Sequence, residues 1–175
     1  SEKERAEEEI ERSKRNLERL LEEAKREIDR SRENLKRTLT KVEEVLRKIK
    51  EDLKRLNVRE DLVKKIDELL KDLERKLREL KKKAEDLHEE VDRALKELVR
   101  RARELHKRVE ERIEEEKKAV EKLIRELREL NKRLAEEIKR LIDELRKLNK
   151  ELDDEVEKII RRAEDLLRDL ERETR

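Results

Sequence analysis

Apolar residues recur every 18 positions along most of this sequence, and 18 residues make five turns of an undistorted α-helix. One row contains Ala6, Ala24 and Val42, and a second contains Leu69, Leu87, Leu105, Leu123, Leu141 and Ile159. A period near 3.6 residues leaves packed helices almost straight, whereas a 3.5-residue heptad period imposes a left-handed supercoil. The pattern therefore predicts long, straight, amphipathic helices.

The composition also favours helices. The 175 residues include no Gly, Pro, Cys, Met or aromatic residue, and 61% of them are Asp, Glu, Lys or Arg. So much charge is typical of a disordered chain or of a solvated single helix. The regular apolar stripe argues against both, because it provides each helix with one continuous face to bury. We therefore expect an all-α bundle.

The charge balance argues against several kinds of partner. Lys plus Arg (54) and Asp plus Glu (52) nearly cancel, and neither sign gathers into an arm. Nucleic-acid binding needs clustered positive charge or aromatic stacking platforms, so we expect no nucleic-acid partner. No apolar run approaches the roughly 20 residues that span a bilayer, so we expect no membrane partner. In a recombinant host the protein should be soluble and cytoplasmic, with no natural location of its own.

The best turn signal lies near the end of the first third. Asn57 can take the left-handed conformation beyond a helix end, and Val58 can pack back onto the helix. Glu60 and Asp61 suit the N-terminus of a following helix. At the start of the chain, Ser1 and Glu4 match a capping box.

A second reversal is less clearly marked. Three equal helices require a turn near residue 118, yet Ile113–Val120 contains no helix breaker or cap. We predict one helical-bundle domain over residues 1–175, with helices at about 2–56, 60–115 and 119–174. The alternative is that the second and third helices are continuous from residue 60 to residue 174.

Polar residues interrupt the apolar stripe in pairs with the same 18-residue spacing. In an antiparallel arrangement Ser13 meets His106 and Ser31 meets His88, because both pairs are centred between Arg59 and Glu60. Likewise, His106 with Asn131 and His88 with Asn149 are centred between Lys118 and Ala119. We therefore predict two polar layers: Ser13, Asn16, His106 and Asn131 in one, and Ser31, Asn34, His88 and Asn149 in the other.

These layers are interpreted as structural hydrogen-bond networks that set helix register and pairing. A metal or acid–base role for the histidines is disfavoured, because His88 and His106 lie about 27 Å apart along a helix. One His with Ser and Asn is also a poor zinc ligand set. The Glu and Asp residues alternate with Lys and Arg, as solvated helix faces do. We expect no catalytic, cofactor-binding or metal-binding residue and no small-molecule substrate.

On these features the chain resembles computationally designed helical bundles with buried hydrogen-bond networks. The resemblance covers all 175 residues and rests on the 18-residue layers, the Glu-Lys-Arg surface, the Leu-Ile-Val core and the matched Ser, Asn and His positions. It implies a straight antiparallel three-helix bundle or coiled coil with high thermal stability. It also implies a structural scaffold or self-assembly module that is not an enzyme. The sequence departs from such designs in having no Gly, Pro or Asp at its expected turns.

Two assembly forms fit these predictions, and the only expected partner is the chain itself. Equal thirds favour a monomer, while the missing second turn leaves a domain-swapped homodimer as a close rival. The alternative function is a natural coiled-coil spacer or an amphipathic helix protein of lipid surfaces. The absence of aromatic residues, which would serve as core Trp or as interfacial anchors, counts against both.

Overall fold

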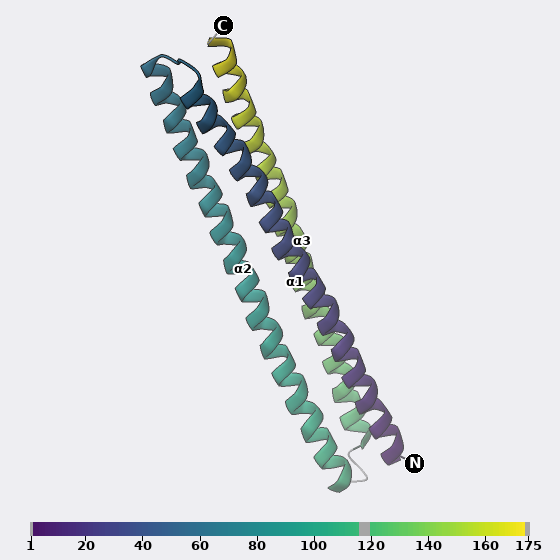
Figure 1. Cartoon of the computed structure of the whole chain (residues 1–175). Coiled ribbons are helices and arrows are strands. Elements are labelled where there is room, and N and C mark those ends of the chain that lie inside the picture. The colour runs from purple at the N-terminus through teal and green to yellow at the C-terminus, as the bar shows by residue number, and fades with distance from the viewer. Residues whose placement is uncertain (1, 116–119, 174–175) are drawn as a thin grey trace. The chain divides into compact units, whose positions relative to one another are not determined.

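The computed structural model describes residues 2–115 and 120–173, and this part of the chain contains three long helices and no strand. The helices are α1 (Glu2–Arg55), α2 (Glu60–Glu115) and α3 (Val120–Glu173). The fold is an all-α three-helix bundle, as the apolar period predicts (Figure 1). Basic residues occupy the last turn of each helix, and acidic residues occupy the first turn of α2 and α3. This placement complements the helix dipoles.

The chain divides into two compact units, and each contains a segment of every helix. Unit 1 comprises Ser1–Asp29 and His88–Leu145, and unit 2 comprises Arg30–Leu87 and Arg146–Arg175. In both units the apolar faces of the three segments pack together. Each unit is therefore a three-helix bundle in its own right.

The core of unit 1 combines residues from all three helices. It contains Ala6, Ile10, Val109, Ile113, Leu123, Ile124 and Leu127. Because the last turns of α2 and the first turns of α3 contribute to this one cluster, the two helices run antiparallel here. The second predicted reversal falls on residues 116–119, which lie outside the described residues, as does Ser1 of the predicted capping box.

The core of unit 2 is built in the same way at the other end of each helix. Its most deeply buried side chains are Ile49, Leu73, Ala163 and Leu170, all with no measurable exposure. A second cluster of this unit contains Leu35, Ala84, Leu148 and Leu152. In Figure 1 the end of α1, the start of α2 and the end of α3 lie together in this unit.

The turn between α1 and α2 differs from the prediction in one respect. Asn57 does not take the left-handed conformation, since no described residue has a positive φ. Instead, the N–H of Val58 donates to the carbonyl of Leu56 at 3.0 Å, while the N–H of Leu56 donates to Asp52 at 2.9 Å. A bond between residues two apart closes a tight turn whose central residue keeps a negative φ. Val58 then packs against the core of unit 2.

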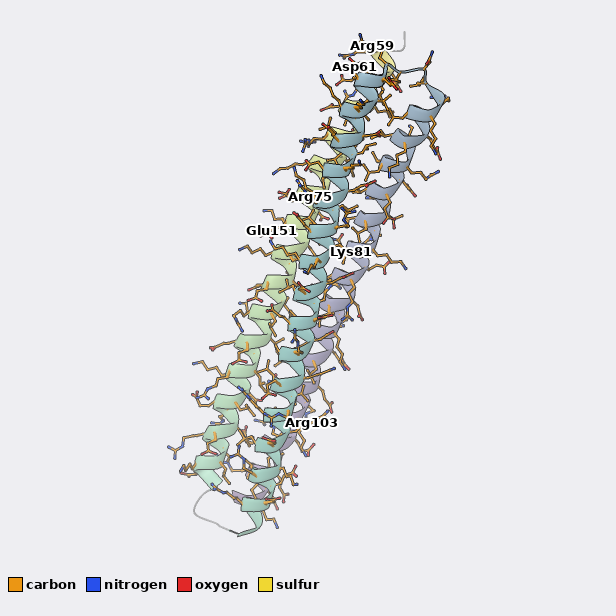
Figure 2. The ribbon with its side chains drawn as sticks, turned by 90° about the vertical axis from the view of Figure 1, so that its left-hand side faces the viewer. Arg59, Asp61, Arg75, Lys81, Arg103 and Glu151 are labelled. Atoms are coloured by element: carbon orange, nitrogen blue, oxygen red, sulfur yellow. The ribbon has the colours of Figure 1, made fainter. Side chains whose placement is uncertain are left out.

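Burial follows the 18-residue rows of the sequence. Ala6, Ala24 and Val42 are 0%, 2% and 1% exposed. No large hydrophobic side chain in the described part of the chain is exposed. Charged side chains project from the outer faces instead, including Arg75 and Lys81 of α2 (Figure 2). The polar residues within the apolar stripe are therefore the exception, and they form the candidate site.

Candidate functional site

Ser13 of α1 is fully buried in unit 1 and bonds to side chains of both other helices. Its Oγ lies 2.6 Å from Nε2 of His106 on α2 and donates to Oδ1 of Asn131 on α3 at 2.9 Å. A hydroxyl has one proton, so the Ser13 oxygen must accept its second bond from His106. The imidazole therefore carries a proton on Nε2. We name Ser13, His106 and Asn131 the unit 1 cluster.

The surroundings of His106 favour the neutral imidazole. The side chain is 4% exposed, and this burial lowers its pKa below the usual value. The positive charge of Lys14 lowers the pKa further, while the negative charge of Glu110 opposes it. Lys14 of α1 and Glu110 of α2 form an ion pair of 2.5 Å, and this hydrogen bond raises the pKa of Lys14. A neutral imidazole has one N–H to donate, whereas an imidazolium has two. Ser13 offers one acceptor, so the neutral form matches the cluster.

A second polar cluster lies in unit 2 between α1 and α3. Ser31, which is fully buried, donates to Oδ1 of Asn149 at 3.1 Å. The amide of Asn34 lies 3.5 Å from the same oxygen and donates to Oδ1 of Asp153 at 3.2 Å. The hydroxyl of Thr38, one turn further on, lies 2.8 Å from the carbonyl of Asn34. We name Ser31, Asn34, Asn149 and Asp153 the unit 2 cluster.

The structure distributes the eight predicted layer residues unevenly. His88 is only 3% exposed, but it belongs to unit 1, whereas Ser31, Asn34 and Asn149 belong to unit 2. The predicted hydrogen-bonded layer of His88 with those three residues is therefore not tested. Asn16 does not join the unit 1 cluster, and its Oδ1 instead accepts a bond of 2.8 Å from Arg19 of its own helix.

Asn34 bonds to α3 and Asn16 does not, because the residues of α3 that correspond to them differ. Asn34 and its partner Asp153 are 119 residues apart. The same separation from Asn16 leads to Ala135, which offers no polar side chain. The 18-residue polar repeat does not indicate Asp153, because the residue 18 positions before it is Ala135. The 118-residue separation of the predicted serine–asparagine pairs leads from Asn34 to Leu152, one position before Asp153, so only the structure identified this partner.

One register relates α1 to α3 in both units. Ser13 and Asn131 are 118 residues apart in unit 1, and Ser31 and Asn149 are 118 apart in unit 2. The ion pair of Glu9 with Arg128 has the nearly identical separation of 119. The two helices are therefore parallel in each unit and keep the same offset. Both serine bonds depend on that offset.

The buried serines of both clusters bond to neighbouring side chains. Among the described residues, no buried side-chain nitrogen or oxygen lacks a hydrogen-bond partner. The same residues contain no group of three or more His, Cys, Asp or Glu able to hold a metal ion. Nor does any helix within them have the length and apolar character needed to cross a membrane. No protein-family model, curated protein or solved structure matches the chain.

Proposed function

We propose that the chain is a designed structural scaffold without natural biochemical activity, in which the two polar clusters select one helix register. The observation that carries this proposal is the equal separation, 118 residues, of the bonds Ser13–Asn131 and Ser31–Asn149. An apolar stripe with an 18-residue period resembles itself after a shift, so slipped packings compete with the correct one. A slip of 18 residues would match one serine with an asparagine and leave the other serine without its partner.

The energetic basis is the cost of burying a polar group without a partner. That cost is about 1–3 kcal/mol for a neutral donor or acceptor. Ser13 and Ser31 are both fully buried, so any register that removes their partners incurs it. Leucine opposite leucine tolerates a slip far better, because dispersion contacts are not directional. The polar residues thus provide specificity that the apolar stripe lacks.

Other features support a designed origin and a role as scaffold. The chain lacks Gly, Pro and every aromatic residue, and its rows keep the 18-residue period over three helices. The absence of any matching family agrees with this origin. The proposal includes no substrate, nucleic-acid, membrane or cofactor partner. We propose a monomer, because α2 and α3 of one chain share the core of unit 1, with the swapped homodimer as the alternative.

Light scattering tests both the assembly and the role of the clusters. The monomer predicts a single species at the chain mass of 21.6 kDa, and twice that mass would indicate the swapped dimer. The triple variant Ser13→Ala, His106→Leu, Asn131→Leu removes the unit 1 cluster, and we expect it to populate more than one mass. Asn16→Leu, which adds a leucine to α1 without touching the cluster, should keep the wild-type mass.

The clusters would have no role in register if the triple variant gave one mass and an amide spectrum as well dispersed as that of the wild type. The rival function, an amphipathic helix protein of lipid surfaces, predicts a different result. In vesicle flotation it would migrate with liposomes, whereas the proposed scaffold stays in the lower fraction.

A further inference from the structure

We propose that unit 1 has a groove between α1 and α2 that binds a single-chain anionic amphiphile, such as a medium-chain fatty acid. The groove has a volume of about 580 Å³, within the range of roughly 300–1,000 Å³ that is typical of small-molecule sites. Leu21, Lys25 and Ile28 line it from α1, and the α2 lining extends from Asp92 to Glu104. This property does not depend on the proposed scaffold role.

The floor of the groove is apolar. Leu21 and Ile28 contribute from α1, and Leu95 and Val99 contribute from α2. Ile28 and Leu95 are 3% and 6% exposed, while Leu21 and Val99 are only partly buried and keep apolar surface in contact with water. An alkyl chain lying on these side chains would remove that surface from water, which is the main favourable contribution to binding.

The rim of the groove carries cations that have no carboxylate partner. Within the described residues, Lys25, Lys96 and Arg103 form no ion pair. The fourth cation, Arg100, is already held by Glu97 at 2.5 Å and by Glu104 at 2.8 Å. Three positive charges around an apolar floor favour a ligand with an anionic head and an apolar tail.

The charges also give the ligand a direction. Arg103, labelled in Figure 2, stands near one end of the α2 lining, and Asp92 stands at the other end. The two residues are about 16 Å apart along the helix. We place the carboxylate at Arg103 and the tail across Val99 and Leu95, with Lys25 and Lys96 beside it. The reverse orientation would bring the anionic head to Asp92.

A groove between α2 and α3 of the same unit serves as an internal comparison. It is smaller, at about 350 Å³, and Leu105 and Leu130 are its only apolar lining residues. Its rim carries Lys122, Arg125 and Arg133 together with Glu126 and Glu129. It therefore has a smaller apolar floor than the α1–α2 groove and a smaller excess of cations over carboxylates among its lining residues. Substitutions there change the net charge of unit 1 without altering the proposed site.

The test is calorimetric titration of the full chain with sodium dodecanoate below its micelle concentration. We expect saturable binding of one molecule per chain. The variant Lys96→Glu, Arg103→Glu should weaken it at least tenfold, whereas Lys122→Glu, Arg125→Glu, with the same change in net charge, should leave it within twofold. Methyl shifts on binding should be confined to the floor residues Leu21, Ile28, Leu95 and Val99.

Any of four results in these experiments would overturn the proposal. These are no saturable binding, equal weakening by both double variants, equal affinity for uncharged dodecanol, and methyl shifts at Leu105 and Leu130 instead. Flotation with anionic vesicles in the absence of dodecanoate binding would indicate a lipid-surface interaction and would also contradict it. A circular dichroism spectrum of each double variant, compared with that of the wild type, verifies that the variant is still folded.

Discussion

Replacing Ser13 by alanine isolates the energetic contribution of the unit 1 cluster. The substitution removes an oxygen that is fully buried and bonded to His106 and Asn131. The Nε2–H of His106, a side chain only 4% exposed, loses its acceptor. Asn131 is partly buried, so water can replace part of its lost bond. The histidine is therefore expected to account for most of the destabilisation.

The expected magnitude follows from the cost of an unpaired buried donor, about 1–3 kcal/mol. Alanine also raises helix propensity over serine by roughly 0.5 kcal/mol, which would hide part of that cost. Asn16→Ala has nearly the same gain in propensity, and within the described residues Asn16 bonds only to Arg19 of its own helix. The difference between the two variants therefore reports the cluster alone. We expect Ser13→Ala to be less stable than Asn16→Ala by about 1–3 kcal/mol.

Guanidinium unfolding at pH 7.5, followed by circular dichroism at 222 nm, measures this difference. The triple variant Ser13→Ala, His106→Leu, Asn131→Leu should recover the lost stability, because replacing all partners leaves no polar group unpaired. If Ser13→Ala and Asn16→Ala agree within about 0.5 kcal/mol, which is the usual spread for neutral surface changes, the cluster does not stabilise the fold as argued.

Three further outcomes are expected. Because burial depresses the folded pKa of His106 below its unfolded value of about 6.5, stability is fully present above that value. It declines as the pH falls through the folded pKa, because the unfolded chain then binds more protons. The unfolding midpoint should change more between pH 7.5 and 5.5 in the wild type than in His106→Gln. An equal change in both proteins would contradict the proposed effect of His106 on stability. Leu127→Ala, at a fully buried site, should cost about 2–5 kcal/mol. Leu130→Ala, at a partly buried site on the same helix, should cost less than half as much as measured by denaturant, and similar losses would contradict the assigned core. Finally, the wild type should keep most of its ellipticity at 70 °C, since its composition combines strong helix formers with a continuous apolar stripe; melting below that temperature would show that the stripe stabilises less than argued.

The sequence by itself determined the helical class of the fold and the buried face of each helix, but it left open whether residues 60–174 form one helix or two. Both depend on a local period, because residues three and four apart share one helix face whatever the helix packs against. The pairing of Ser13 with His106 and Asn131 also followed from sequence. Once the reversals are placed midway between matched residues, only one antiparallel register aligns the 18-residue repeats.

Only the tertiary structure decided which side chain stands opposite each polar residue. It joined Asn34 to Asp153 and left Asn16 with Arg19, although the two asparagines are equivalent in the repeat. It also kept Asn57 out of the left-handed conformation, because Asn57 is the central residue of a tight turn that the N–H of Val58 closes onto the carbonyl of Leu56. These outcomes depend on distances between helices and on backbone hydrogen bonds of a single loop, and neither is encoded in a periodic pattern.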